Sequence, residues 1–60
     1  MNLLQKREEK KMTQEKLAEL TGLTRQAISA YETKKAVPSV NTAKKIAAAL
    51  GFDWQRFYEE

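Results

Sequence analysis

The chain has 60 residues and contains neither cysteine nor histidine. That composition excludes disulfide bonds, thiol redox chemistry, zinc sites and imidazole acid–base catalysis, so we expect no metal and no cofactor. A domain of this size without such crosslinks relies on well-packed helices or on a partner. No apolar run approaches the roughly 20 residues that span a bilayer, which predicts one soluble, cytoplasmic domain over residues 1–60 with no membrane partner.

The positive charge is concentrated in the middle of the chain. The formal net charge is +3, from 11 Lys and Arg against 8 Asp and Glu, which suits an anionic partner but does not require one. The acidic residues Glu59 and Glu60 lie outside the segment Thr13–Lys45. That segment holds six bases and three acids: Lys16, Arg25, Lys34, Lys35, Lys44 and Lys45 against Glu15, Glu19 and Glu32.

Apolar residues recur every three or four positions and never alternate with period two, which predicts helices throughout. The first helix is expected over about Leu3–Lys10, with Leu3, the stem of Lys6 and Arg7 on one face. We expect the second helix to begin after Thr13, a good N-cap residue. Its inward residues are predicted to be Leu17, Ala18 and Leu20.

The turn Thr21–Leu23 is expected to end the second helix, because Gly22 can adopt a positive φ. Thr24 then caps a third helix over about Arg25–Thr33, with Ile28 and Tyr31 buried. A basic loop, Lys34–Pro38, follows this helix.

The last two helices are also marked by their ends. Ser39 is the predicted N-cap of a fourth helix, and Gly51 stops it. Asp53 caps a short fifth helix that carries aromatic residues. The predicted inner stripe of the fourth helix is Val40, Ala43, Ile46, Ala47 and Leu50. The aromatic residues Phe52, Trp54 and Phe57 are expected to close the core below this stripe. Tyr58 is expected to face either the core or a second subunit.

The segment QEKLAELTGLTRQAISAYET, residues 14–33, carries the pattern of a helix-turn-helix. Two helices that cross at about 90–120° through a short turn need a small residue at the contact, here Ala18. They also need a glycine in the turn, Gly22, and a branched apolar residue that anchors the second helix, Ile28. Each feature alone is common, but the three together between two threonine caps form a specific signal.

This chain resembles the lambda-repressor/Cro-type helix-turn-helix regulators, also called the xenobiotic-response-element family. REEKKMTQEKLAELTGLTRQAISAYETKK is similar to the first three helices of the family, and PSVNTAKKIAAALGFDWQRF to the fourth and fifth. The resemblance implies an all-α fold, compact and five-helical. It also implies a DNA-binding transcriptional regulator, which we expect to be a repressor, whose third helix enters the major groove of double-stranded DNA.

The resemblance implies which residues touch DNA. It assigns base contacts to Arg25, Gln26, Ser29 and Ala30, and a phosphate contact to Gln14 with Thr13 nearby. Phosphate contacts are also expected from Thr24 and from Lys34 and Lys35, because the charge of the loop lysines suits the DNA backbone. The chemistry agrees, since Arg pairs with guanine O6 and N7 and Gln with adenine N6 and N7. The alternative is that Arg25 and Gln26 are only solvated helix residues and that Lys34 and Lys35 are ordinary loop lysines. Lys44 and Lys45 are expected to form the polar face of their helix.

The family also pairs an Arg of its first helix with a Glu near the end of the third, which implies a partly buried, structural ion pair between Arg7 and Glu32. In three places the chain departs from the family pattern. Lys11 and Lys34 stand where glycine is usual, and a left-handed Lys costs on the order of 1 kcal/mol, so these turns are candidates for rearrangement. Lys6 occupies a usually apolar site, which its aliphatic stem can cover.

Three classes of function are compatible with a domain of this kind. The first is a homodimeric regulator on a pseudo-palindromic site, with no small-molecule ligand evident. The second is a partner-dependent module, such as an antitoxin or the DNA-binding piece of a longer repressor. The third, an enzyme, is disfavoured because Ser29 and the lysines have neither a neighbouring base nor a desolvated pocket to activate them.

Overall fold

The computed structural model describes residues 2–58, and Glu59 and Glu60 lie outside the described residues. It confirms the all-helical fold class, and no strand is formed within this range. The fifth helix differs from the prediction, since it is a single short 3-10 segment and not an α-helix. The elements are α1 (Leu3–Glu9), α2 (Gln14–Thr21), α3 (Arg25–Glu32), α4 (Val40–Leu50) and the 3-10 helix η1 (Trp54–Tyr58).

Each α-helix begins at a side chain that accepts a hydrogen bond from the backbone of the first turn. Thr13, Thr24 and Ser39 act in this way, as predicted, on the N–H groups of Lys16, Ala27 and Thr42. Asn2, which the sequence analysis did not assign, caps α1 through the N–H of Gln5 at 3.0 Å. Asp53 accepts from the N–H of Gln55 at 3.0 Å, which sets the start of η1. These caps satisfy N–H groups that have no partner within their own helix.

All four α-helices end with the same backbone arrangement. The residues Lys11, Gly22, Lys34 and Gly51 have φ of 54°, 73°, 61° and 76°. In every case the next residue donates its N–H to the carbonyl five positions earlier, at 2.9–3.1 Å, from Met12 to Arg7, Leu23 to Ala18, Lys35 to Ala30 and Phe52 to Ala47. The turns at Lys11 and Lys34 are therefore not rearranged, and both lysines adopt the left-handed conformation.

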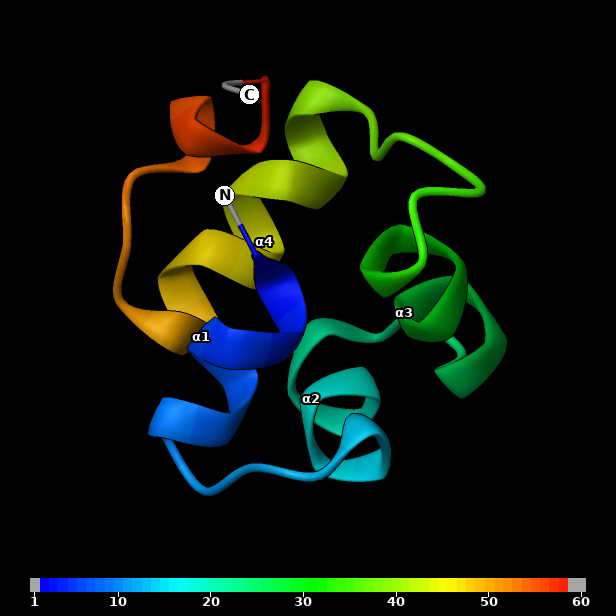
Figure 1. Ribbon diagram of the computed structural model, residues 1–60, viewed down its shortest axis with the longest axis vertical. Coiled ribbons are helices and arrows are strands. Elements are labelled where there is room, and N and C mark those ends of the chain that lie inside the picture. Colours follow the sequence, from blue (N-terminus) through cyan, green and yellow to red (C-terminus); the bar gives the residue numbers. More distant parts are fainter. Residues whose placement is uncertain (1, 59–60) are drawn as a thin grey trace.

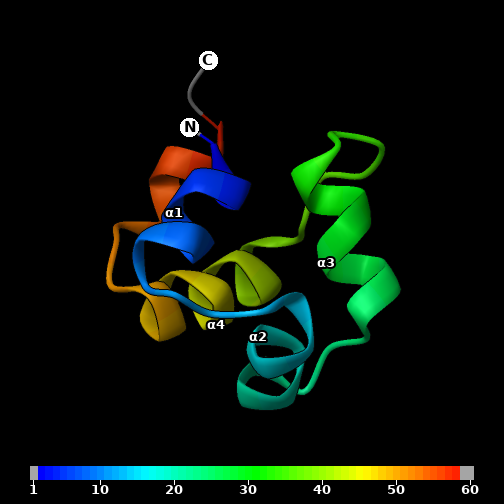
Figure 2. The same cartoon turned by 60° about the horizontal axis from the view of Figure 1, so that its bottom comes forward.

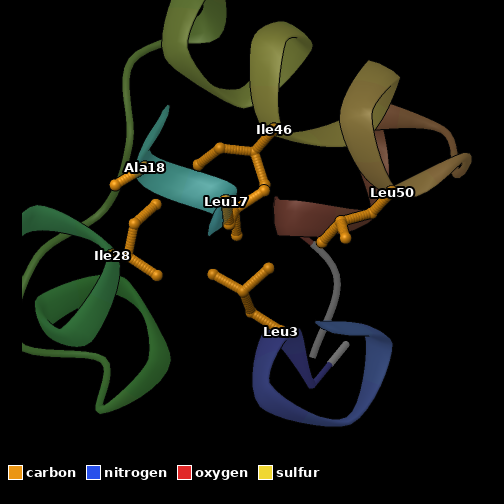
Figure 3. Packing of buried hydrophobic residues seen from close by; sticks show 6 residues of the cluster. All are labelled: Leu3, Leu17, Ala18, Ile28, Ile46 and Leu50. Carbon is orange, nitrogen blue, oxygen red and sulfur yellow. The ribbon is translucent and has the colours of Figure 1, made fainter. Parts of the chain in front are cut away.

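The core lies where α1, α2, α3 and α4 meet (Figure 3). Leu17, Ile28 and Ile46 are fully buried, and their side chains point toward one another from three different helices (Figure 3). Leu3 closes the core from α1. Ala18, Ala43, Ala47 and Leu50 complete the buried apolar set, while Met12, Leu23, Tyr31, Ala49, Phe52 and Phe57 pack on it and are partly buried.

Two predicted core residues are in fact exposed. Leu20 is 53% exposed and Val40 is 45% exposed. Thr21, placed in the turn by the sequence analysis, is instead the last residue of α2 and is 7% exposed. Its hydroxyl donates to the carbonyl of Leu17 at 2.8 Å, which allows a polar side chain to take the buried position.

The helices are arranged so that α3 stands at the edge of the molecule (Figures 1 and 2). α2 packs against both α3 and α4, α1 contacts α3, and η1 folds back on α4. No helix within residues 2–58 is long and apolar enough to cross a membrane.

Candidate nucleic-acid interface

Helix α3 is held from one side only. Ile28 is fully buried and anchors the helix to the core, whereas Arg25 and Gln26 in its first turn are exposed. Ser29 and Ala30 are half-buried, one turn further along. The first two turns of α3 therefore bring together the four residues predicted to read bases, and Arg25 and Gln26 extend into solvent.

The turn between α2 and α3 has the expected geometry. Gly22 takes a φ of 73°, and the N–H of Leu23 donates to the carbonyl of Ala18 at 3.1 Å. Ala18 itself is 8% exposed, and α2 and α3 pack closely. A larger side chain at this contact would force the helices apart, so the small residue fixes the approach of α2 to α3.

The residues predicted to contact phosphates lie at three positions around α3. Thr13 and Gln14 are at the start of α2, Thr24 is at the start of α3, and Lys34 and Lys35 follow its end. Thr13, Thr24 and both lysines are exposed. The threonine hydroxyl oxygens accept backbone N–H bonds as caps, which leaves each O–H free to act as a donor.

Arg7 and Glu32 form the ion pair that the resemblance implies. Arg7 Nε lies 2.6 Å from Glu32 Oε2, and Arg7 Nη2 lies 3.4 Å from Glu32 Oε1. The two side chains are 13% and 6% exposed. Arg7 Nη1 also donates to the carbonyl of Met12 at 2.8 Å, so one guanidinium connects α1, the turn after it and the end of α3.

Two contacts were missed by the sequence analysis. Gln14 Nε2 donates to Glu32 Oε1 at 2.9 Å, which directs the amide of a predicted phosphate contact toward a carboxylate. The hydroxyl of Tyr58 donates to the carbonyl of Pro38 at 2.9 Å and connects η1 to the loop after α3. Both pairs are distant in sequence, and neither leaves a local pattern that could have revealed it.

The end of α3 differs from the other helix ends in its side chains. After α1, α2 and α4, the residue that donates the closing bond is apolar and packs on the core: Met12, Leu23 and Phe52. After α3 that residue is Lys35, which is exposed. Lys34 before it has a φ of 61°. The α3 end thus lacks both the unstrained glycine and the apolar contact that stabilise other helix ends. In their place it has two lysine ammonium groups next to the candidate reading helix.

Comparison with known families agrees with this architecture. A family model described as helix-turn-helix matches residues 3–57. The chain belongs to this Cro/C1-type helix-turn-helix family of DNA-binding transcriptional regulators.

Several similar proteins are named HTH-type transcriptional regulators. The HTH-type transcriptional regulator PuuR of Escherichia coli (strain K12) is 35% identical over 54 residues, 90% of this chain but 29% of PuuR. The uncharacterized HTH-type transcriptional regulator YqaF of Bacillus subtilis (strain 168) is 40% identical over 58 residues, 97% of this chain and 76% of YqaF. An uncharacterized HTH-type transcriptional regulator of Methanothermobacter thermautotrophicus is 51% identical over 45 residues, 75% of this chain and 65% of that protein. No solved structure matches the chain.

Proposed function

We propose that this domain is a sequence-specific repressor that reads the major groove with α3 and binds its operator as a homodimer. The observation that carries the proposal is the pair Arg25 and Gln26, exposed in the first turn of a helix whose opposite side is anchored by the buried Ile28. Both side chains can make two hydrogen bonds to a purine edge, and each such pair contributes about 1–3 kcal/mol of discrimination. Repression would follow when the bound domain occludes the polymerase.

Affinity in this proposal comes from phosphate contacts that carry no sequence information. The start of α2 offers Thr13 and Gln14, the start of α3 offers Thr24, and the loop after it offers Lys34 and Lys35. Lys34 has a strained backbone, and the exposed Lys35 takes a place where an apolar residue would pack on the core. Both lysines thus make the helix end less stable, which supports a role for them in binding and not in folding. Affinity should therefore fall steeply with salt.

The proposed homodimer is supported by the limited reach of one reading helix and by exposed apolar and aromatic side chains. Val37, in the loop after α3, is 72% exposed, Val40 45% and Tyr58 46%. A two-fold dimer would place two copies of α3 about 34–36 Å apart, one helical turn of DNA. Its operator would then be a pseudo-palindrome.

The test is selection of duplexes from a randomised pool, followed by binding measurements on the enriched sequence. A two-fold symmetric motif is the expected result. A motif with one half-site would contradict the homodimer, and no enrichment at low salt would contradict DNA reading by α3.

Two alanine variants separate the assigned roles. Arg25→Ala should relax the preference at one base pair and cost about 1–3 kcal/mol on the selected site. Lys35→Ala, the matched control, should weaken all sequences alike and lower the salt slope by about one. An equal loss on every sequence for Arg25→Ala would contradict its base-reading role.

A further inference from the structure

We infer that Gln14 is a positioning residue, which fixes the phosphate-contacting start of α2 relative to the end of the reading helix α3 through the carboxylate of Glu32. The inference rests on the proposed function. It assigns Gln14 a task beyond a phosphate contact, namely a contribution to sequence discrimination.

One carboxylate connects three helices. Glu32, the last residue of α3, accepts from Arg7 Nε of α1 at 2.6 Å and from Gln14 Nε2 of α2 at 2.9 Å. The side chain of Glu32 is 6% exposed, so these bonds are shielded from water. Hydrogen bonds to a charged group in such surroundings are about twice as strong as bonds between neutral groups.

The bond between Gln14 and Glu32 lies at the ends of α2 and α3 that the turn does not join. The turn at Gly22 connects the end of α2 to the start of α3. Gln14 is the first residue of α2 and Glu32 the last of α3. With the turn at one end and this bond at the other, the two helices are tied at both ends, which restricts the angle between them.

That angle sets how α3 lies when the start of α2 rests on the DNA backbone. The Gln14 amide has two N–H donors, of which one goes to Glu32 and the other remains for a phosphate oxygen. A phosphate held by Gln14 is thereby at a fixed place relative to Arg25 and Gln26. Loss of the tie should reduce binding to the correct operator more than binding to random DNA, whereas loss of a simple phosphate contact lowers both equally.

The experiment compares dissociation constants for the selected operator and for a random duplex at one salt concentration. Gln14→Met retains the volume of the half-buried side chain but removes its hydrogen bonds. We expect operator binding to become about tenfold weaker, which corresponds to the loss of one charge-assisted hydrogen bond. Binding to the random duplex should become less than about threefold weaker. In a Glu32→Met background, in which residue 32 has no oxygen to accept from Gln14, the same change should alter the ratio of the two constants by less than about twofold. Gln5→Met, an exposed glutamine on α1, is the matched control and should leave the ratio unchanged.

The inference would be overturned if Gln14→Met weakened binding to both duplexes by the same factor. It would also be overturned if Gln14→Met changed the ratio of the two dissociation constants equally with and without Glu32. Gln14 would then be a phosphate contact alone. If the wild-type chain bound both duplexes equally well, the proposed function itself would be overturned. This outcome is seen with the wild-type protein alone, so it is distinct from a failure of the inference about Gln14. Far-UV circular dichroism verifies that each variant is folded. If Glu32→Met is unfolded, the inference is decided by the ratio of the two dissociation constants measured for Gln14→Met alone.

Discussion

The helix ends of this molecule share one backbone geometry but differ in the residue at the left-handed position, which is either glycine or lysine. The ends of α2 and α4 have glycine in the left-handed position, Gly22 and Gly51, while the ends of α1 and α3 have Lys11 and Lys34. The hydrogen bond that closes each end is nearly the same length in all four. The backbone motif therefore does not depend on glycine, and glycine only lowers its free energy.

The lysine ends are held by contacts from elsewhere in the fold. Arg7 donates to the carbonyl of Met12, directly after Lys11, and Tyr58 donates to the carbonyl of Pro38, in the loop after Lys34. Lys34 is itself predicted to contact phosphate, whereas Lys11 is not among the predicted DNA contacts. The comparison teaches that a left-handed helix end can form without glycine where tertiary contacts support the chain that follows it.

The largest expected effect comes from removing the support at the α1 end. Arg7→Met leaves the Met12 carbonyl without its side-chain donor and the buried Glu32 carboxylate without its cation. We expect a loss of about 3–5 kcal/mol in the free energy of unfolding, measured by urea denaturation and circular dichroism. Lys10→Met, an exposed change in the same region, should stay within about 0.5 kcal/mol. A loss below about 1 kcal/mol for Arg7→Met would show that the pair contributes little.

The second largest effect on stability is expected when the glycines at the ends of α2 and α4 are replaced by alanine. A Cβ at Gly22 would have no atom within 4 Å, and at Gly51 only Lys10 Nζ and Cε, at 3.8 and 3.9 Å. Gly22→Ala and Gly51→Ala should therefore cost only backbone strain, about 1–2 kcal/mol each. Thermal unfolding should show a fall of roughly 4–8 °C per kcal/mol. Unchanged melting temperatures would mean that the left-handed position carries no strain in this fold.

The reverse exchange at the lysine ends should separate stability from binding. Lys34→Gly and Lys11→Gly should each stabilise the domain by about 1 kcal/mol in thermal unfolding. Only Lys34→Gly is expected to weaken DNA binding and to lower the salt slope by about one. If both variants bound DNA as the wild type does, Lys34 would have no role as a phosphate contact.

The smallest effect is expected at the residue after Lys34. Lys35→Leu gives the α3 end the apolar residue that Met12, Leu23 and Phe52 supply at the other ends. We expect a gain of at most about 0.5 kcal/mol in stability, together with weaker binding to all DNA sequences. A gain in stability with unchanged affinity would remove Lys35 from the interface.

Features with a local cause could be predicted from the sequence. The caps Thr13, Thr24 and Ser39 and the stops Gly22 and Gly51 act on backbone groups a few residues away, and the structure has all five as expected. The bond from Gln14 to Glu32 spans 18 positions and depends on how α2 and α3 pack, so no local pattern indicates it.

The two exposed residues show the limit of periodicity in short helices. The buried side of α2 consists of Leu17, Ala18 and Thr21. Successive helix residues turn by about 100°, which places Leu20, one position before Thr21, outside that stripe. Its hydrophobicity alone suggested otherwise. Val40 keeps the spacing of the buried α4 residues, but it lies in the first turn and remains 45% exposed.

The C-terminal 3-10 helix contains the single tryptophan of the chain, Trp54. Its ring lies edge-on to Tyr58, with centroids 6.1 Å apart, and the ammonium of Lys44 on α4 is 5.3 Å from its centroid. Indole emission is sensitive to a neighbouring cation and to water, so Trp54 is a built-in optical probe of the docking of η1 on α4. Fluorescence can therefore follow detachment of this end of the domain separately from the events at α3, without any added label.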